Sequence, residues 1–180
     1  MTKTKKIVLI GLFAALTVVV GYVLLAVPNV ELVTATIFIG GYLLGPYAGC
    51  AIGTVGEFLY ALVNPLGMSS PPLLVAQVLS MAIVGLIGGW FGQRKFWPEN
   101  SPLRFLIFAV TGVVLTLVFD ILTTLSFAPF VAGWNIKKIV VIFFSGVPFY
   151  ITHWIVNFII FGTIVPMILL ALKNKNFEYE

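Results

Sequence analysis

Most of this chain consists of long apolar stretches, and three ionisable residues, Glu57, Asp120 and His153, lie inside them. An ionisable side chain at membrane depth costs at least ~2.5 kcal/mol on insertion scales, so a residue kept there marks a candidate functional site. The composition is 61% hydrophobic and 9% charged, which excludes an ordinary soluble domain, where charged residues make up roughly 25%. The sequence therefore predicts an all-α integral membrane protein.

Six apolar segments are expected to cross the membrane as helices. We place them at about residues 6–27, 33–47, 48–64, 72–93, 103–127 and 138–172. Gly45 and Pro46 separate the second segment from the third, and a single 32-residue helix over both is the alternative. The last segment exceeds the ~20 residues that span a bilayer, so it tilts, projects beyond the membrane, or breaks near Gly146 and Pro148. Residues 1–180 are expected to form a single domain.

Charge distribution predicts the orientation of these helices. The basic start, Met1 to Lys6, resembles that of a signal peptide, but the run of about 20 apolar residues behind it fits a retained membrane helix better. With this end inside, eight lysines and arginines are cytoplasmic and two, Lys137 and Lys138, lie outside. By the positive-inside rule, this favours six spans with cytoplasmic N- and C-termini. Seven spans, with the last segment divided, fit the charges less well.

Signals for catalysis, metal binding and nucleic-acid binding are weak. The single cysteine, Cys50, excludes an intrachain disulfide and a CxxC site. The sequence holds no HExxH, GxSxG or Walker A motif, and one histidine with scattered acids does not match a metal cluster of known spacing. We expect no enzyme activity, no metal and no cofactor. The net charge of +4 comes from segment ends, which suits membrane orientation rather than nucleic-acid binding.

Polar recognition chemistry concentrates in the connections expected outside, at residues 28–32, 64–72 and 128–137. Measured from the expected exterior helix ends, Glu57 and Asp120 share a depth of roughly 10–12 Å. Three helices carry polar stripes at helical spacing, which we expect to converge on a pocket open to the exterior. The candidate binding residues in these loops and stripes are Asn29, Glu31, Glu57, Tyr60, Asn64, Asp120, Thr124, Trp134, Asn135, Tyr150, His153 and Asn157.

Structural explanations compete with a binding role for these residues. Glu57, Asp120 and His153 also suit an interhelical hydrogen-bond network without a ligand. Thr123 and Thr124 also suit hydrogen bonds to the backbone of their own helix. Trp134 and Tyr150 also suit positions at the membrane interface, and Lys137 and Lys138 suit contacts with lipid headgroups. Gln77 fits either explanation.

Small residues recur at helical spacing. Gly11 and Ala15 form a small-xxx-small pair in the first segment, and glycines recur between residues 40 and 56. Such residues let helices approach closely, which suits either internal packing or docking of another membrane protein.

In combination, these patterns resemble the substrate-binding, or S, components of energy-coupling factor (ECF) vitamin transporters over essentially the whole chain. The resemblance rests on the six segments, the basic start before Gly11 to Ala15, and the stretches at 40–49 and 146–149 with His153 and Asn157. It implies a multi-pass protein of the prokaryotic plasma membrane that captures a vitamin or cofactor precursor from outside. It also implies docking onto a transmembrane coupling subunit driven by two cytoplasmic ATPases. Gly11 and Ala15 occupy the spacing of the family's alanine-pair docking motif.

The ligand is less closely defined. Asp120 with Thr123 and Thr124, and the last helix with its histidine, resemble members of the family associated with cobalamin or other tetrapyrrole-related compounds. This resemblance implies a cobalamin-like ligand. The alternative function is a stand-alone ion-coupled small-molecule carrier or channel, with Glu57, Asp120 and His153 relaying protons. An intramembrane enzyme using Asp120 and His153 as acid and base is the third hypothesis.

Overall fold

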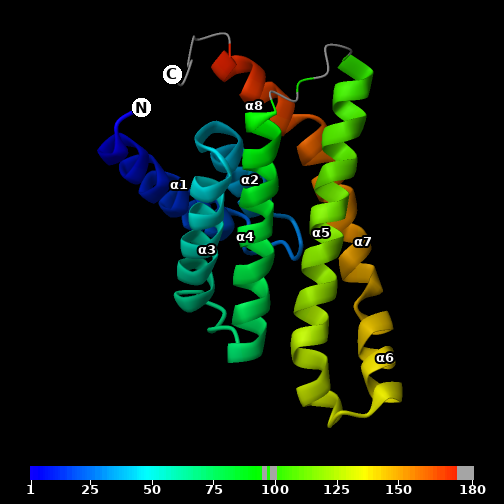
Figure 1. The fold of residues 1–180 in the computed structure, drawn as a ribbon. Coiled ribbons are helices and arrows are strands. Elements are labelled where there is room, and N and C mark those ends of the chain that lie inside the picture. Colours follow the sequence, from blue (N-terminus) through cyan, green and yellow to red (C-terminus); the bar gives the residue numbers. More distant parts are fainter. Residues whose placement is uncertain (95–96, 98–100, 174–180) are drawn as a thin grey trace.

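The computed structural model describes residues 1–94, 97 and 101–173, and its regular secondary structure is helical throughout these ranges (Figure 1). This confirms the all-α prediction. The eight helices are α1 (Lys3–Val23), α2 (Val33–Leu44), α3 (Pro46–Leu62), α4 (Pro71–Gln93), α5 (Ser101–Ala132), α6 (Ile136–Ser145), α7 (Val147–Gly162) and α8 (Ile164–Lys173).

The predicted break between the second and third segments is confirmed at Gly45. Its φ of 91° lies in a region that glycine occupies without the steric cost of a Cβ. Pro46 follows at the first position of α3, where a missing amide hydrogen breaks no helical bond. The alternative of one continuous helix over both segments is therefore wrong.

The last segment is divided, and the fifth is longer than predicted. Residues 136–173 form α6, α7 and α8, with breaks at Gly146 and Thr163. Of the alternatives for the last segment, the break near Gly146 is confirmed. Helix α5 continues to Ala132 rather than residue 127, because the residues after 127 are apolar and remain helical. The helix ends at Gly133, which has a φ of 60°. The connection predicted at 128–137 is therefore mostly helical.

Among the described residues, four helical segments are long and apolar enough to cross a membrane by length and composition. They are α1, α4, α5, and α7 with α8 over Val147–Leu172. Helices α2 and α3 are shorter, with 12 and 17 residues. The count of six spans and the cytoplasmic termini stay predictions.

Helices α3, α4, α5 and α7 run roughly parallel or antiparallel, whereas α1 and α8 are inclined to them (Figure 1). Helices α1 and α5 begin, and α4 and α8 end, towards the upper end of the bundle in that view. At the lower end, α3 and α5 end and α4 begins. The start of α1 and the end of α8 therefore lie towards the same end of the bundle.

Helices α2, α3 and α4 pack with their backbones in direct contact, through glycines. A Cβ added at Gly41 or Gly49 would collide with the carbonyl oxygen of Gly85, and one added at Gly53 would collide with that of Met81. A Cβ at Gly85 would in turn strike the carbonyl of Gly49. Internal packing therefore explains these glycines of the second and third segments.

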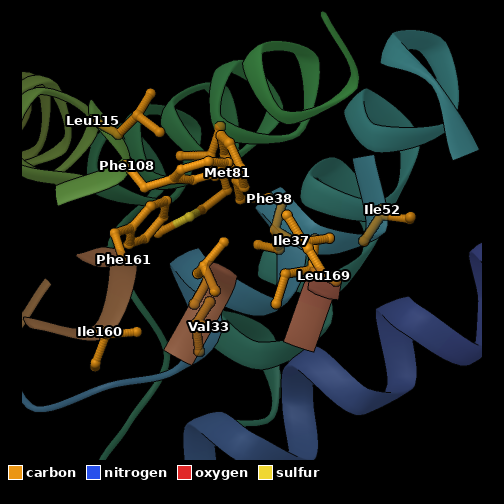
Figure 2. Packing of buried hydrophobic residues seen from close by; sticks show 14 of the residues in the cluster. Val33, Ile37, Phe38, Ile52, Met81, Phe108, Leu115, Ile160, Phe161 and Leu169 are labelled. Atoms are coloured by element: carbon orange, nitrogen blue, oxygen red, sulfur yellow. The ribbon is translucent and has the colours of Figure 1, made fainter. Parts of the chain in front are cut away.

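The central element is α2, which is buried on nearly every side, as expected for a helix that is apolar all round. Its fully buried Phe38 meets the edges of three aromatic rings, at centroid distances of 5.6 Å to Phe91, 6.1 Å to Phe108 and 5.2 Å to Phe161. Figure 2 shows this cluster, in which α2 joins α4 to α5 and α7. Both halves of the bundle therefore share one core.

We expect Gly85→Ala to lower the midpoint of thermal unfolding in mild detergent. The added methyl group meets the backbone of α3 rather than a movable side chain, and overpacking of this kind costs about 1–3 kcal/mol. Gly11→Ala is the matched control, because a Cβ there meets no atom within 4 Å. Equal midpoints for the two variants would contradict the proposed role of Gly85 in backbone packing.

Candidate functional site

The connection between α1 and α2 folds inward against α7. Asn29, at a φ of 59°, donates a hydrogen bond from Nδ2 to the Phe149 carbonyl at 2.7 Å. Two residues later, Oε2 of Glu31 accepts a hydrogen bond from the backbone amide of Thr34 in the first turn of α2, at 2.8 Å. A segment predicted as an exterior loop therefore brings a carboxylate to the interior of the bundle.

Asp120 of α5 binds two side chains of α7. Its Oδ1 lies 3.0 Å from Nδ1 of His153, and its Oδ2 accepts a hydrogen bond from Nε1 of Trp154 at 2.8 Å. An ionised carboxylate only accepts hydrogen bonds, so Nδ1 of His153 carries the hydrogen in this pair. Phe119 packs edge-on against the imidazole, with ring centroids 5.9 Å apart. The position and tautomer of His153 are thereby set from α5.

Glu31 reaches the opposite side of His153. Its Oε1 lies 3.5 Å from Nε2 of His153, an ion-pair distance that is long for a hydrogen bond. The same Oε1 accepts a hydrogen bond from Nδ2 of Asn157 at 3.1 Å. We call Glu31, Asp120, His153, Trp154 and Asn157 the buried polar network.

The environment of Glu31 favours its charged form. Burial alone raises the pKa of Glu31, but the approach of His153 and the hydrogen bond from Thr34 outweigh burial, so its pKa lies below the ordinary value. Glu31 is therefore ionised at neutral pH, as an anchor for the His153 and Asn157 side chains requires.

Thr124 and Tyr150 extend the network towards the lower end of the bundle. Their hydroxyl oxygens lie 2.6 Å apart, and the Tyr150 ring stacks on Trp154 at 6.3 Å with an interplanar angle of 24°. Thr123 instead donates to the Phe119 carbonyl of its own helix at 2.7 Å, which is the structural alternative considered for it.

Glu57 and Tyr60 form a separate group on α3. The Glu57 side chain is buried and lies within electrostatic range of Glu31, and the Tyr60 ring packs on Tyr22 with centroids 5.4 Å apart. Glu57 is five residues from the end of α3, whereas Asp120 is twelve from the end of α5. These distances differ because α5 extends further towards the lower end of the bundle than α3 (Figure 1), so the shared depth of the two acids stays a prediction.

Three predicted residues have local roles away from the network. Oδ1 of Asn64 accepts a hydrogen bond from the Leu66 amide at 2.9 Å, and Asn135 caps α6 through the amides of its first turn. Trp134 is 73% exposed. Their part in ligand binding stays a prediction. Trp154 belongs to the polar stripe predicted for the last segment but is not among the candidate binding residues, and the structure brings it to Asp120.

Two apolar clefts open near the lower end of the bundle. The larger, of about 530 Å³, lies between the start of α4 and the end of α5 and is lined by Ser70, Pro72, Leu73, Phe127, Phe130 and Val131. The smaller, of about 350 Å³, lies between α5 and α6 beside Lys137 and Lys138. The larger cleft has the size and apolar character usual for a small-molecule site.

Within the described ranges, three buried side-chain atoms lack a hydrogen-bond partner. They are Oε1 of Gln77, Nε2 of His153 and Oδ1 of Asn157. A buried polar atom left unpaired is costly, and most such atoms in proteins find a partner. The buried polar network and α4 thus retain unused hydrogen-bonding capacity.

Gly11 and Ala15 lie on the exposed face of α1. They neighbour the equally exposed Val8 and Leu12, at 63% and 61%. Internal packing does not occupy Gly11, since a Cβ there meets open space. Docking through this face stays a prediction.

We expect Asp120→Ala to reduce thermal stability in mild detergent strongly. It leaves the His153 and Trp154 donors unpaired in a buried site, and breaking a buried charged pair costs about 3–5 kcal/mol. Ser145→Ala is the control, because its exposed hydroxyl bonds only to its own helix. An unfolding midpoint for Asp120→Ala equal to that of Ser145→Ala would show that the network does not hold α5 to α7.

Comparison with known proteins identifies the family of this chain. A family model described as ECF transporter, substrate-specific component, matches residues 5–165. The riboflavin transporter RibU of Lactococcus lactis subsp. cremoris, from strains NZ9000 and MG1363, is 28% identical to this chain over 151 residues, which cover 77% of this chain and 71% of the relative. No solved structure matches significantly. Because the family model spans nearly the whole chain, the protein belongs to the substrate-specific components of ECF transporters, as its sequence patterns indicated.

Proposed function

We propose that this chain is the membrane-embedded, high-affinity substrate-binding subunit of an ECF-type importer and that its ligand is riboflavin or a closely related flavin. Membership of the family supports the first part, and two relatives named as riboflavin transporters support the second. The expectation of a cobalamin-like ligand finds no support in these comparisons.

The observation that carries the proposal is the larger cleft, together with the polar groups deeper in the bundle. Phe127 and Phe130 offer aromatic surfaces for a planar ring system. Thr124 lies one helical turn deeper than Phe127 on α5, and its partner Tyr150 leads to Trp154 and the buried polar network. An apolar wall with a few polar groups at one end suits a flavin, which has a flat ring, one polar edge and a hydroxylated side chain.

Within this site we assign two kinds of role. His153 and Asn157 have unpaired atoms available for a ligand, whereas Glu31 and Asp120 already bind protein groups and position them. Residues nearer the ends of the helices serve as an outer rim: Asn29, Glu57, Tyr60, Asn64, Trp134 and Asn135.

The proposed function also implies how the helices cross the membrane. Six crossing segments, α1, α2, α3, α4, α5 and α7 with α8, leave both termini in the cytoplasm and the larger cleft facing outside. The start of α1 and the end of α8 lie towards the same end of the bundle, which supports this arrangement (Figure 1). The protein is then a multi-pass component of a prokaryotic plasma membrane.

Transport needs partners in this proposal. The chain itself hydrolyses no ATP, and the exposed face of α1 around Gly11 and Ala15 docks onto a transmembrane coupling subunit that two cytoplasmic ATPases drive. The exposure of both residues supports this role.

The first test is purification of the chain alone in mild detergent, followed by mass spectrometry of the small molecules that accompany it. We expect one flavin per protein and quenching of riboflavin fluorescence on addition to ligand-free protein. Cobalamin and thiamine serve as comparison ligands. Tight binding of either comparison ligand without riboflavin binding would refute the flavin assignment while retaining a vitamin-binding subunit.

A second test separates docking from binding. Gly11→Leu and Ala15→Leu place bulk on the exposed face of α1, so riboflavin uptake by cells should fall about ten-fold or more while the affinity of the purified protein stays within about two-fold. Val114→Leu, which enlarges an exposed residue of α5, is the control and should leave uptake unchanged. Equal loss of affinity and uptake would instead indicate that the two residues support the fold.

An ion-coupled carrier is the second candidate, because His153 lies between the carboxylates of Asp120 and Glu31, an arrangement that suits a proton relay. Uptake by vesicles containing this chain alone, abolished by a protonophore, would favour that function over the ECF proposal.

A further inference from the structure

We infer that Gln77 of α4 is a specificity-determining residue, whose Oε1 accepts a hydrogen bond from a ring N–H of the ligand at the level of Asn157. The inference rests on the proposed function, because it assumes that a flavin occupies the site. It assigns a recognition role to a helix that supplied no residue to the predicted binding set.

Two hydrogen bonds fix the orientation of the Asn157 side-chain amide. Its Nδ2 donates to Oε1 of Glu31 at 3.1 Å and, more weakly, to the His153 carbonyl at 3.4 Å. Both partners are acceptors, so nitrogen and oxygen of the amide cannot be exchanged without loss of these bonds. Oδ1 of Asn157 is therefore a buried acceptor without a partner.

Gln77 supplies a second such acceptor. Its Oε1 is buried and unpaired, although the residue as a whole is only partly buried. Gln77 lies four residues after Leu73, which lines the larger cleft, and four residues before Met81 of the core. Residues four apart share a helix face, so Gln77 lies between the cleft and the core on one face of α4.

The helix register places Gln77 and Asn157 at a common level. Met81 and Phe161 belong to the same cluster around Phe38 (Figure 2), and each lies four residues after Gln77 or Asn157, respectively. Helices α4 and α7 run in the same direction (Figure 1). Gln77 and Asn157 therefore each lie one helical turn before the cluster, at the same level of the bundle and on the side of the larger cleft.

This level of the bundle offers two buried acceptors without a partner, Oε1 of Gln77 and Oδ1 of Asn157. The Asn157 amide hydrogens already bind Glu31 and the His153 carbonyl, and Nδ1 of His153 binds Asp120. A ligand that brings an N–H group removes the penalty of an unpaired buried oxygen, whereas a ligand that lacks it leaves that penalty in place. The site thus selects planar heterocycles with a ring N–H. In an oxidised flavin this group is the imide N–H, and the side-chain hydroxyls can serve Asn157.

The experiment compares riboflavin with its analogue methylated at the imide nitrogen, using quenching of flavin fluorescence by the ligand-free protein in detergent. Wild-type protein should bind riboflavin about ten-fold or more tightly than the methylated analogue. Gln77→Met keeps the side-chain volume but removes the acceptor, so the affinity ratio should fall to about three or less, mainly through weaker riboflavin binding. Ser80→Ala is the matched control, since this buried hydroxyl on α4 bonds only within its own helix, and it should retain the wild-type ratio.

The outcomes separate this inference from the proposed function. Equal affinity of wild-type protein for both flavins, or an unchanged ratio in Gln77→Met, would overturn the role of Gln77 and leave the flavin function standing. Failure of wild-type protein to bind riboflavin would overturn both. Thermal unfolding checks that each variant is folded, and Gln77→Leu provides a second acceptor-free variant. The wild-type comparison alone still decides whether the imide N–H is recognised.

Discussion

The carboxylate of Asp120 must find hydrogen-bond donors inside an apolar bundle, and the arrangement of α5, α7 and the α1–α2 connection depends on that requirement. A buried charge is tolerated only when it is paired and hydrogen-bonded. His153 and Trp154 supply donors from α7, and His153 in turn faces Glu31. One carboxylate on α5 therefore sets the register of α7 and draws an irregular segment into the interior.

The other half of the bundle is held together differently. Helices α2, α3 and α4 meet backbone to backbone at Gly41, Gly49 and Gly85, a contact that leaves little room for relative movement. Phe38 then joins this glycine-packed half to α5 and α7 through edge-on aromatic contacts. The larger cleft lies where α4, from the first half, and α5, from the second, separate towards the lower end of the bundle.

This division suits capture of a small aromatic molecule by a substrate-specific ECF component. The glycine-packed half offers a fixed wall carrying Gln77, and the other half offers aromatic side chains and the buried polar network. The carboxylates of that network are engaged with protein groups, so in the proposed function they orient His153 and Asn157, which contact the ligand. The glycines at 41, 49 and 53 serve internal packing, whereas Gly11 and Ala15 stay exposed on α1.

The sequence by itself determined the helical class, the break at Gly45, the family, and the candidacy of Asp120, His153 and Asn157. These follow from composition, local backbone chemistry and helical spacing, which act over a few residues. Only the tertiary structure decided that Glu31 turns inward to His153, that Trp154 completes the shell around Asp120, and that α5 extends to Ala132 beside a cleft. Those features depend on contacts between residues as many as 126 positions apart, because a buried polar group binds whichever partner packing brings to it, and no local pattern in the sequence specifies that partner.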